Sequence, residues 1–150
     1  MSSTSPGSKV SIAIGNTIAD MAKVVDLVDR FGAEHFIPQS ISNDLNLCLD
    51  ELLNNTISYG YDDKGRHSIV VTLSLADGRL MIEIEDDAKP FDPRKATHAP
   101  EGILQSRKIG GLGLHFVKAL MDDVSYMRVG RQNVVTMAKK LSRGTADGDR

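Results

Sequence analysis

The sequence predicts an α+β fold in which helices cover one face of a mixed or mainly antiparallel sheet. Two observations lead to this class. The predicted elements follow the order strand, helix, helix, strand, strand, helix, strand, strand, and each pair of adjacent strands is joined by a short turn suited to an antiparallel hairpin. A hydrophobic content of 41% in 150 residues can supply one packed core, so we expect a single domain.

The first strand and helix are visible as a change in hydrophobic period. Strict alternation predicts a short strand that carries Val10, Ile12 and Ile14. Steps of three and four residues then predict an amphipathic helix whose apolar side is formed by Ile18, Met21, Val25 and Val28. Asn16 or Thr17 is suited to cap this helix, and Gly32 is expected to end it.

A second helix is expected after the break at Pro38, and its apolar stripe consists of Leu45, Leu49, Leu52, Leu53 and Ile57. An antiparallel hairpin follows, with strands at 68–75 and 80–86 around the turn signal Asp77-Gly78. A long irregular stretch covers 89–109, a length typical of a functional lid or a disordered loop. The third helix and a hairpin at 124–140 complete the folded part.

Composition excludes several classes of protein. Eighteen Lys and Arg against 20 Asp and Glu give a net charge of −2, which argues against binding nucleic acid through bulk charge. Apolar runs are too short for a membrane helix, and residues 1–8 are polar, so we expect neither membrane insertion nor export. The single Cys48 can form neither an internal disulfide nor a multi-cysteine zinc site, which fits the reducing cytoplasm. We expect a disordered lead at 1–8, a folded domain at 9–141 and a flexible tail at 142–150.

Two polar residues of the second helix form the first candidate site. Glu51 and Asn55 are four residues apart, so they share one helix face, one turn from each other. The amide oxygen of Asn is a suitable ligand for Mg²⁺, which takes few protein ligands and completes its shell with phosphate oxygens and water. A Glu can accept a proton from an attacking hydroxyl or water. The alternative is that both are ordinary solvent-facing helix residues.

A carboxylate at the end of the 80–86 strand forms the second candidate site. Asp86 follows a strand that is expected to be buried, and a carboxylate there can accept the exocyclic amine of a purine. The alternative is a charged turn that continues into the bend at Asp92-Pro93.

Glycines at the start of the third helix form the third candidate site, in the run Gly110, Gly111, Leu112, Gly113 and Leu114. Glycines let the backbone approach an anion closely, and a helix N-terminus offers free N–H groups, so the run predicts a phosphate-binding loop. It is not a P-loop, because no Gly-Lys-Ser/Thr follows, and Phe116 occupies the third glycine position of a dinucleotide fingerprint. A flexible hinge is the alternative.

Taken in order, the Glu-x-x-x-Asn helix, the strand-end Asp, Phe91-Asp92-Pro93, the long loop and the glycine run resemble the GHKL ATPase superfamily. That superfamily contains gyrase, heat-shock chaperone, histidine kinase and mismatch-repair ATPases, and the resemblance is strongest to its small anti-sigma-factor serine kinases. It covers about Ile12 to Leu141. It implies a two-layer α/β sandwich of the Bergerat type, with ATP or ADP and Mg²⁺ as cofactors.

The resemblance also implies roles for individual residues. Glu51 matches the general base and Asn55 the Mg²⁺ ligand, while Asp86 matches the acid that binds the adenine amine. The glycine run matches the box that contacts phosphates, and Thr136 resembles the adenine-pocket threonine. The implied function is an ATP-dependent serine/threonine kinase and anti-sigma factor that phosphorylates an antagonist. Implied partners are a sigma factor, an anti-anti-sigma protein and a second copy of the chain, without direct contact to nucleic acid or membrane.

One departure from the family pattern bears on nucleotide binding. The family usually has glycine two residues after the acid, where this chain has Ala88. If that position needs a positive φ, alanine costs about 1 kcal/mol or more, or the loop takes another path. Asp87 is then an alternative purine acid. Two other functions stay open: a regulatory binding module without kinase activity, and the detached catalytic domain of a histidine kinase.

Overall fold

The computed structural model describes residues 8–95 and 111–141. The expected tail at 142–150, nearly all of the expected lead at 1–8, most of the long irregular stretch and Gly110 lie outside these described residues. Within them, no helix is both long enough and apolar enough to cross a lipid bilayer.

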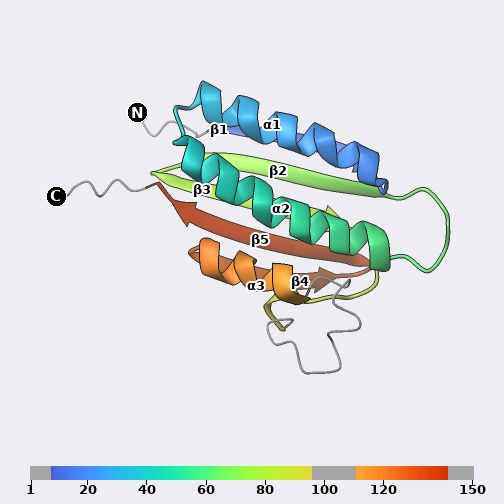
Figure 1. The fold of residues 1–150 in the computed structure, drawn as a ribbon. Helices are drawn as coiled ribbons and strands as arrows, with labels where there is room; N and C mark the ends of the chain where they lie inside the picture. The colour runs from blue at the N-terminus through green and yellow to red at the C-terminus, as the bar shows by residue number, and fades with distance from the viewer. Residues whose placement is uncertain (1–7, 96–110, 142–150) are drawn as a thin grey trace.

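The described strands form one five-stranded sheet in the order β1-β2-β3-β5-β4 (Figure 1). Every neighbouring pair is antiparallel, so the sheet is wholly antiparallel rather than mixed. The two predicted hairpins are confirmed as β2–β3 and β4–β5. The strands are β1 (Ser8–Gly15), β2 (Ser68–Ala76), β3 (Arg79–Asp86), β4 (Asp123–Val129) and β5 (Gln132–Lys140).

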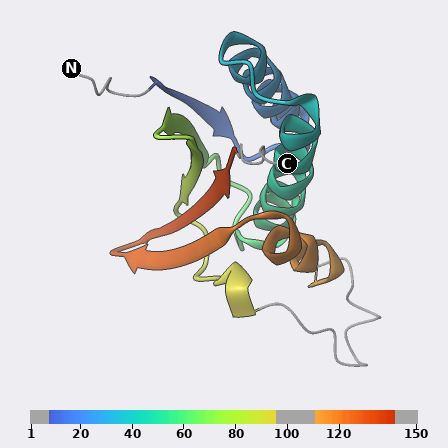
Figure 2. The same ribbon diagram turned by 90° about the vertical axis from the view of Figure 1, so that its left-hand side faces the viewer.

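The helices cover one face of this sheet and leave the other face open, as Figure 2 shows from the side. The predicted α+β architecture is therefore confirmed. The main helices are α1 (Met21–Glu34), α2 (Gln39–Tyr59) and α3 (Gly111–Leu120). Two short 3-10 turns, η1 (Ile18–Asp20) and η2 (Pro93–Lys95), precede α1 and follow β3.

The core lies between α2 and the central strands. Alternate residues of β2 and β3 are fully buried, beginning with Ile69 on β2 and Leu80 on β3, and they meet the predicted leucine stripe of α2. The intervening positions face the open side and are more polar, as the hydrogen bond between the Ser11 and Thr72 hydroxyls at 2.7 Å illustrates. This strict alternation is why the hairpin at 68–86 was predictable from the sequence.

The buried side of α1 differs from the predicted one. Thr17 does cap the start of the helical segment, where its side chain accepts the Asp20 N–H, but it caps the short turn η1. Met21 and Val28 are buried as predicted, but Ile18 and Val25 are 54% and 42% exposed, and Val24 and Phe31 complete the buried side. Adjacent valines satisfy the helical period equally well, so only the packing against the sheet selects Val24 over Val25.

Gly32 does not end α1, which continues to Glu34. The chain turns instead at Phe36, whose φ is 58°. Gly32 is needed where α1 crosses α2, because a Cβ there would lie 2.6 Å from the Ser42 Oγ of α2. The glycine therefore permits close packing of two helices rather than a helix stop.

This contact predicts coupling between two substitutions. Alanine is favoured over glycine by about 1 kcal/mol inside a helix. We expect Gly32→Ala to raise the free energy of unfolding by about that amount in a Ser42→Ala background, where no hydroxyl obstructs it. With native Ser42 the gain should vanish or reverse. Urea unfolding of the four chains measures this, and equal effects of Gly32→Ala in both backgrounds would contradict the steric explanation.

Candidate functional site

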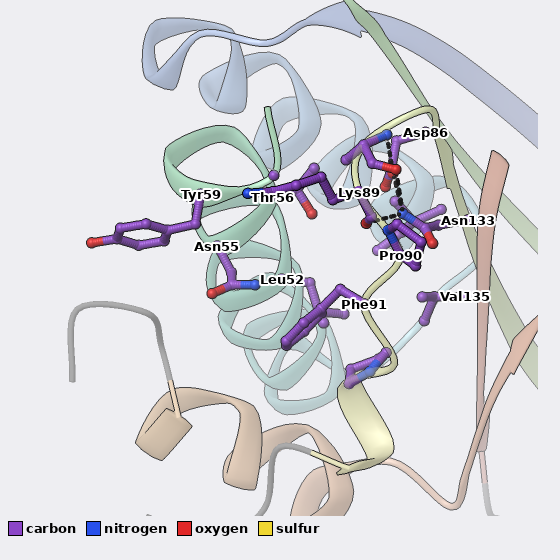
Figure 3. Close-up of a pocket in the computed structure, with 14 residues that line it drawn as sticks. Leu52, Asn55, Thr56, Tyr59, Asp86, Lys89, Pro90, Phe91, Asn133 and Val135 are labelled. Carbon is purple, nitrogen blue, oxygen red and sulfur yellow. Dashed lines mark hydrogen bonds between the residues drawn. The ribbon is translucent and has the colours of Figure 1, made fainter. Parts of the chain in front are cut away.

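A cavity of about 210 Å³ opens between the C-terminal half of α2 and the ends of β3 and β5 (Figure 3). Its polar end is formed by Asp86 and Asn133, and its apolar walls come from Leu52, Phe91, Pro93 and Val135. An apolar cavity of roughly 150 Å³ is enough to admit benzene. The described cavity therefore has the size and character suited to a flat heterocycle, with a carboxylate at one end.

Asp86 is the buried acid of this cavity, with only 4% of its surface exposed. Its Oδ1 accepts the Ala88 N–H at 3.0 Å and an Asn133 side-chain N–H at 2.9 Å. Burial raises the pKa of Asp86, while these two hydrogen bonds act in the opposite direction. The alternative acid, Asp87, is exposed and does not line this cavity.

The departure at Ala88 carries no backbone strain. Among the described residues that have a side chain, only Phe36 and Asp77 have a positive φ. The close approach occurs instead at Gly60, where an added Cβ would lie 2.8 Å from the Ala88 Cβ. The Lys89 N–H donates to the Gly60 carbonyl at 2.9 Å, which holds this loop against the end of α2. The loop thus accommodates alanine because its neighbour is glycine.

Asn133 is a site residue that sequence reasoning missed. It lies at the start of β5, opposite Asp86 in the β3–β5 register, and 4% of its surface is exposed. Its side-chain oxygen accepts the Tyr126 hydroxyl at 2.6 Å and Arg128 Nη1 at 3.1 Å. A polar residue in phase with the buried Val135 and Met137 was the available signal, because every second residue of a strand shares a face.

Thr136 does not reach the cavity, so its predicted place in the adenine pocket is wrong. It lies opposite Glu83 on the open face of the sheet, beside Thr72 and Met81. Its neighbour Val135 is the residue that lines the cavity. A shift of one residue along a strand moves a side chain to the other face, and the core-facing residues of β5 are odd-numbered.

Glu51 and Asn55 lie on α2 at the predicted spacing of one turn. Asn55 is 8% exposed and lines the cavity, and its Oδ1 is buried with no hydrogen-bond partner among the described residues. A buried carbonyl oxygen without a donor suits a hard cation, so this residue fits the Mg²⁺ that the sequence resemblance implies. Burial raises the pKa of Glu51, and Asp50 adds to the effect, which favours a role in proton transfer.

No larger cluster of metal ligands accompanies Asn55 within the described residues. The described part of the chain contains no group of three His, Cys, Asp or Glu side chains arranged to hold a metal ion. A cation here would take most of its ligands from phosphate and water, which is the usual pattern for Mg²⁺.

The glycine run belongs to the start of α3. Gly111, Leu112, Gly113 and Leu114 form the first residues of that helix, as predicted, and Gly110 lies outside the described residues. The helix packs against α2 and η2, which carry walls of the cavity. Contact of these glycines with phosphate stays a prediction.

A second polar cluster adjoins the cavity. His67 stacks on Tyr61 with ring centroids 4.1 Å apart, and it lies between the carboxylates of Asp63 at 2.9 Å and Asp87 at 3.2 Å. The two carboxylates raise the pKa of His67. The cluster therefore ties the segment after α2 to the residue that follows Asp86.

The chain belongs to the histidine kinase-like ATPase domain family, whose pattern matches residues 14–139. This confirms the resemblance seen in the sequence. The five-stranded antiparallel sheet covered on one face by helices agrees with this assignment.

Curated relatives include protein kinases of bacteria. Serine-protein kinase RsbW of Oceanobacillus iheyensis is 26% identical over 113 residues, which are 71% of this chain and 70% of that protein. Serine/threonine-protein kinase BtrW of Bordetella bronchiseptica is 31% identical over 94 residues, 62% of this chain and 66% of that protein. Both relatives are thus named as serine or serine/threonine protein kinases.

A solved structure shares the fold. The structure of the RsbU and RsbW domains of Rv1364c from Mycobacterium tuberculosis matches with a TM-score of 0.64 and 22% identity over 91% of this chain. This chain spans about a third of that protein, 33% of its length.

We expect Asp86→Asn to raise the stability of the fold and to lower its affinity for ADP. The amide oxygen can still accept both hydrogen bonds without a buried charge, so the free energy of unfolding should rise at neutral pH, the direction that the raised pKa of Asp86 dictates. Chemical unfolding and ADP titration measure the two effects. ADP affinity should fall about 10- to 100-fold through the lost charged acceptor. The exposed Asp123→Asn, at the start of β4, is the control, and a destabilised Asp86→Asn chain would contradict this explanation.

The histidine cluster predicts a pH-dependent contribution to stability. Because folding raises the pKa of His67, its stabilising effect is complete below the ordinary value of 6.5 and is lost as the pH rises through the folded value. The stability difference between the native chain and His67→Gln should therefore be larger in mildly acidic than in alkaline buffer. Urea unfolding at both pH values tests this. In an Asp87→Asn background the pH dependence should shrink, and an unchanged profile there would remove Asp87 from the explanation.

Proposed function

We propose that this chain is an ATP-dependent serine/threonine protein kinase that also acts as an anti-sigma factor. The observation that carries the proposal is one cavity with a buried, hydrogen-bonded acid, Asp86, at one end and the unpartnered Asn55 oxygen on its helical wall. The names of the curated relatives support the choice of kinase over other ATPase activities. The substrate would be a serine of an antagonist protein.

The cavity suits the base of ATP or ADP. Asp86 would accept the exocyclic amine of adenine through Oδ2, since both of its hydrogen bonds within the described residues end on Oδ1. Leu52, Phe91 and Val135 would hold the flat ring by apolar contact. The glycine run at the start of α3 would offer backbone N–H groups to the phosphates.

Phosphoryl transfer depends mainly on position and charge. Asn55 would hold Mg²⁺, which when bound neutralises charge on the phosphate oxygens. Glu51, one turn before Asn55, would accept the proton of the serine hydroxyl. Its partial burial supports this role, because the raised pKa that results makes a carboxylate a stronger base.

The regulatory part of the proposal follows from the resemblance to anti-sigma-factor serine kinases that the sequence shows. The unphosphorylated antagonist, an anti-anti-sigma protein, would compete with a sigma factor for the kinase, so phosphorylation would switch partners and regulate transcription. The active form would be a homodimer, and a sigma-factor partner would place it in the cytoplasm. No direct contact with nucleic acid is required by this scheme.

The alternative is a regulatory binding module without kinase activity. Its main support was the strain expected at Ala88, and that residue does not have a positive φ. The kinase proposal is therefore the better supported of the two, and transfer activity decides between them.

The test is phosphate incorporation from Mg-ATP into an anti-anti-sigma domain. Glu51→Gln should reduce turnover about 100-fold or more, the size expected for loss of a general base, with ADP affinity unchanged. Asn55→Ala should instead weaken the dependence of nucleotide affinity on Mg²⁺. The exposed Glu34→Gln, at the end of α1, is the matched charge control. Tight ADP binding without any incorporation by the native chain would overturn the kinase and leave the binding module.

A further inference from the structure

Both polar atoms of the Asn133 side chain form hydrogen bonds within the protein. Its amide nitrogen donates to Asp86 Oδ1 at 2.9 Å and to the carbonyls of Ala88 at 3.2 Å and Lys89 at 3.0 Å. Its oxygen accepts from the Tyr126 hydroxyl and from Arg128 Nη1. No free donor or acceptor is left to contact a ligand, so any effect of Asn133 on binding must pass through Asp86.

Arg128 determines which way the Asn133 amide faces. A guanidinium can only donate hydrogen bonds, so the atom that meets Arg128 must be the amide oxygen. The amide nitrogen then faces Asp86. Arg128 also donates to the Ala88 carbonyl at 2.8 Å, so one cation on β4 fixes both Asn133 and the loop after β3.

We propose that Asn133 is a positioning residue that holds the Asp86 carboxylate with Oδ2 free toward the cavity, so that the cavity selects purines with a 6-amino group over 6-oxopurines. This inference rests on the proposed nucleotide site, whose acid Asp86 already implies a preference for a 6-amino purine, and it assigns the residue that maintains this preference. The reason is chemical: an ionised carboxylate only accepts hydrogen bonds, which suits an amine, whereas a 6-oxo group is itself an acceptor.

The charges around Asp86 make Asn133 important for its ionisation. Burial favours the protonated form, and so does Asp87, while the Asn133 and Ala88 donors and Arg128 favour the carboxylate. Tyr61, from the segment after α2, is near enough for Asp86 to raise its pKa. Lys89 lines the same cavity from the loop. If the Asn133 donor is removed, burial raises the pKa of Asp86 further. The protonated Asp86 can then donate a hydrogen bond to a 6-oxo group.

The experiment measures affinities of the full chain for ADP and inosine diphosphate by calorimetry, from mildly acidic to mildly alkaline pH. Asn133→Leu should weaken ADP binding about 10- to 100-fold, as expected for a lost hydrogen bond to a charged group. Binding of inosine diphosphate should weaken less, so the preference for ADP falls. The acid limb of ADP binding should also move to higher pH.

Val135→Ala is the matched control, because Val135 lines the same cavity two residues along the same strand. It should weaken both nucleotides by the same factor and leave the pH profile unchanged. Tyr126→Phe, which removes one donor to the Asn133 oxygen, should lower the preference for ADP by a smaller factor than Asn133→Leu. If Asn133→Leu does not fold, Tyr126→Phe decides the matter.

An Asn133→Leu chain, or Tyr126→Phe in its place, with native preference and native pH profile would overturn the positioning role. Failure of the native chain to bind ADP would overturn the nucleotide site itself. Native binding without phosphoryl transfer would overturn the kinase but leave this inference intact.

Discussion

The antiparallel pairing of β3 with β5 is the constraint on which the site depends. Its register places Asp86, the last residue of β3, opposite Asn133 near the start of β5, on the face that the helices cover. A carboxylate buried there needs hydrogen bonds, because an unpaired charge in the core is strongly unfavourable. Asn133 and the Ala88 N–H supply them, and in doing so they fix the loop that forms one wall of the cavity.

The same loop explains how the chain accommodates Ala88, where the resemblance seen in the sequence leads us to expect glycine. Lys89 is hydrogen-bonded to Gly60 at the end of α2, and Asn133 and Arg128 hold the neighbouring carbonyls. The backbone therefore reaches its path without a positive φ at Ala88. Glycine is instead needed at position 60, where a Cβ would clash with the Ala88 side chain and with the Thr56 carbonyl oxygen of α2.

Stability and function compete at this site, since burial raises the pKa of Asp86 and of Glu51 alike. Desolvation of these two carboxylates opposes folding, and the Asn55 oxygen has no hydrogen-bond partner among the described residues. Buried polar groups of this kind are expected where a protein binds a ligand that completes their interactions. On α2 the buried Asn55 lines the cavity together with Leu52, a member of the leucine stripe that packs in the core.

The sequence by itself determined the order of elements, both hairpins and the choice of Asn55 and Asp86, which line the cavity, because these depend on local period, turn chemistry and spacing within one element. Only the tertiary structure decided that Val24 rather than Val25 is buried, that Gly32 packs against Ser42, and that Asn133 rather than Thr136 reaches the cavity. Each of these outcomes depends on which face of a helix or strand is turned toward the core. A helix or strand carries its period in its own sequence, but its orientation is set by neighbours that are distant along the chain, as Asp86 and Asn133 are.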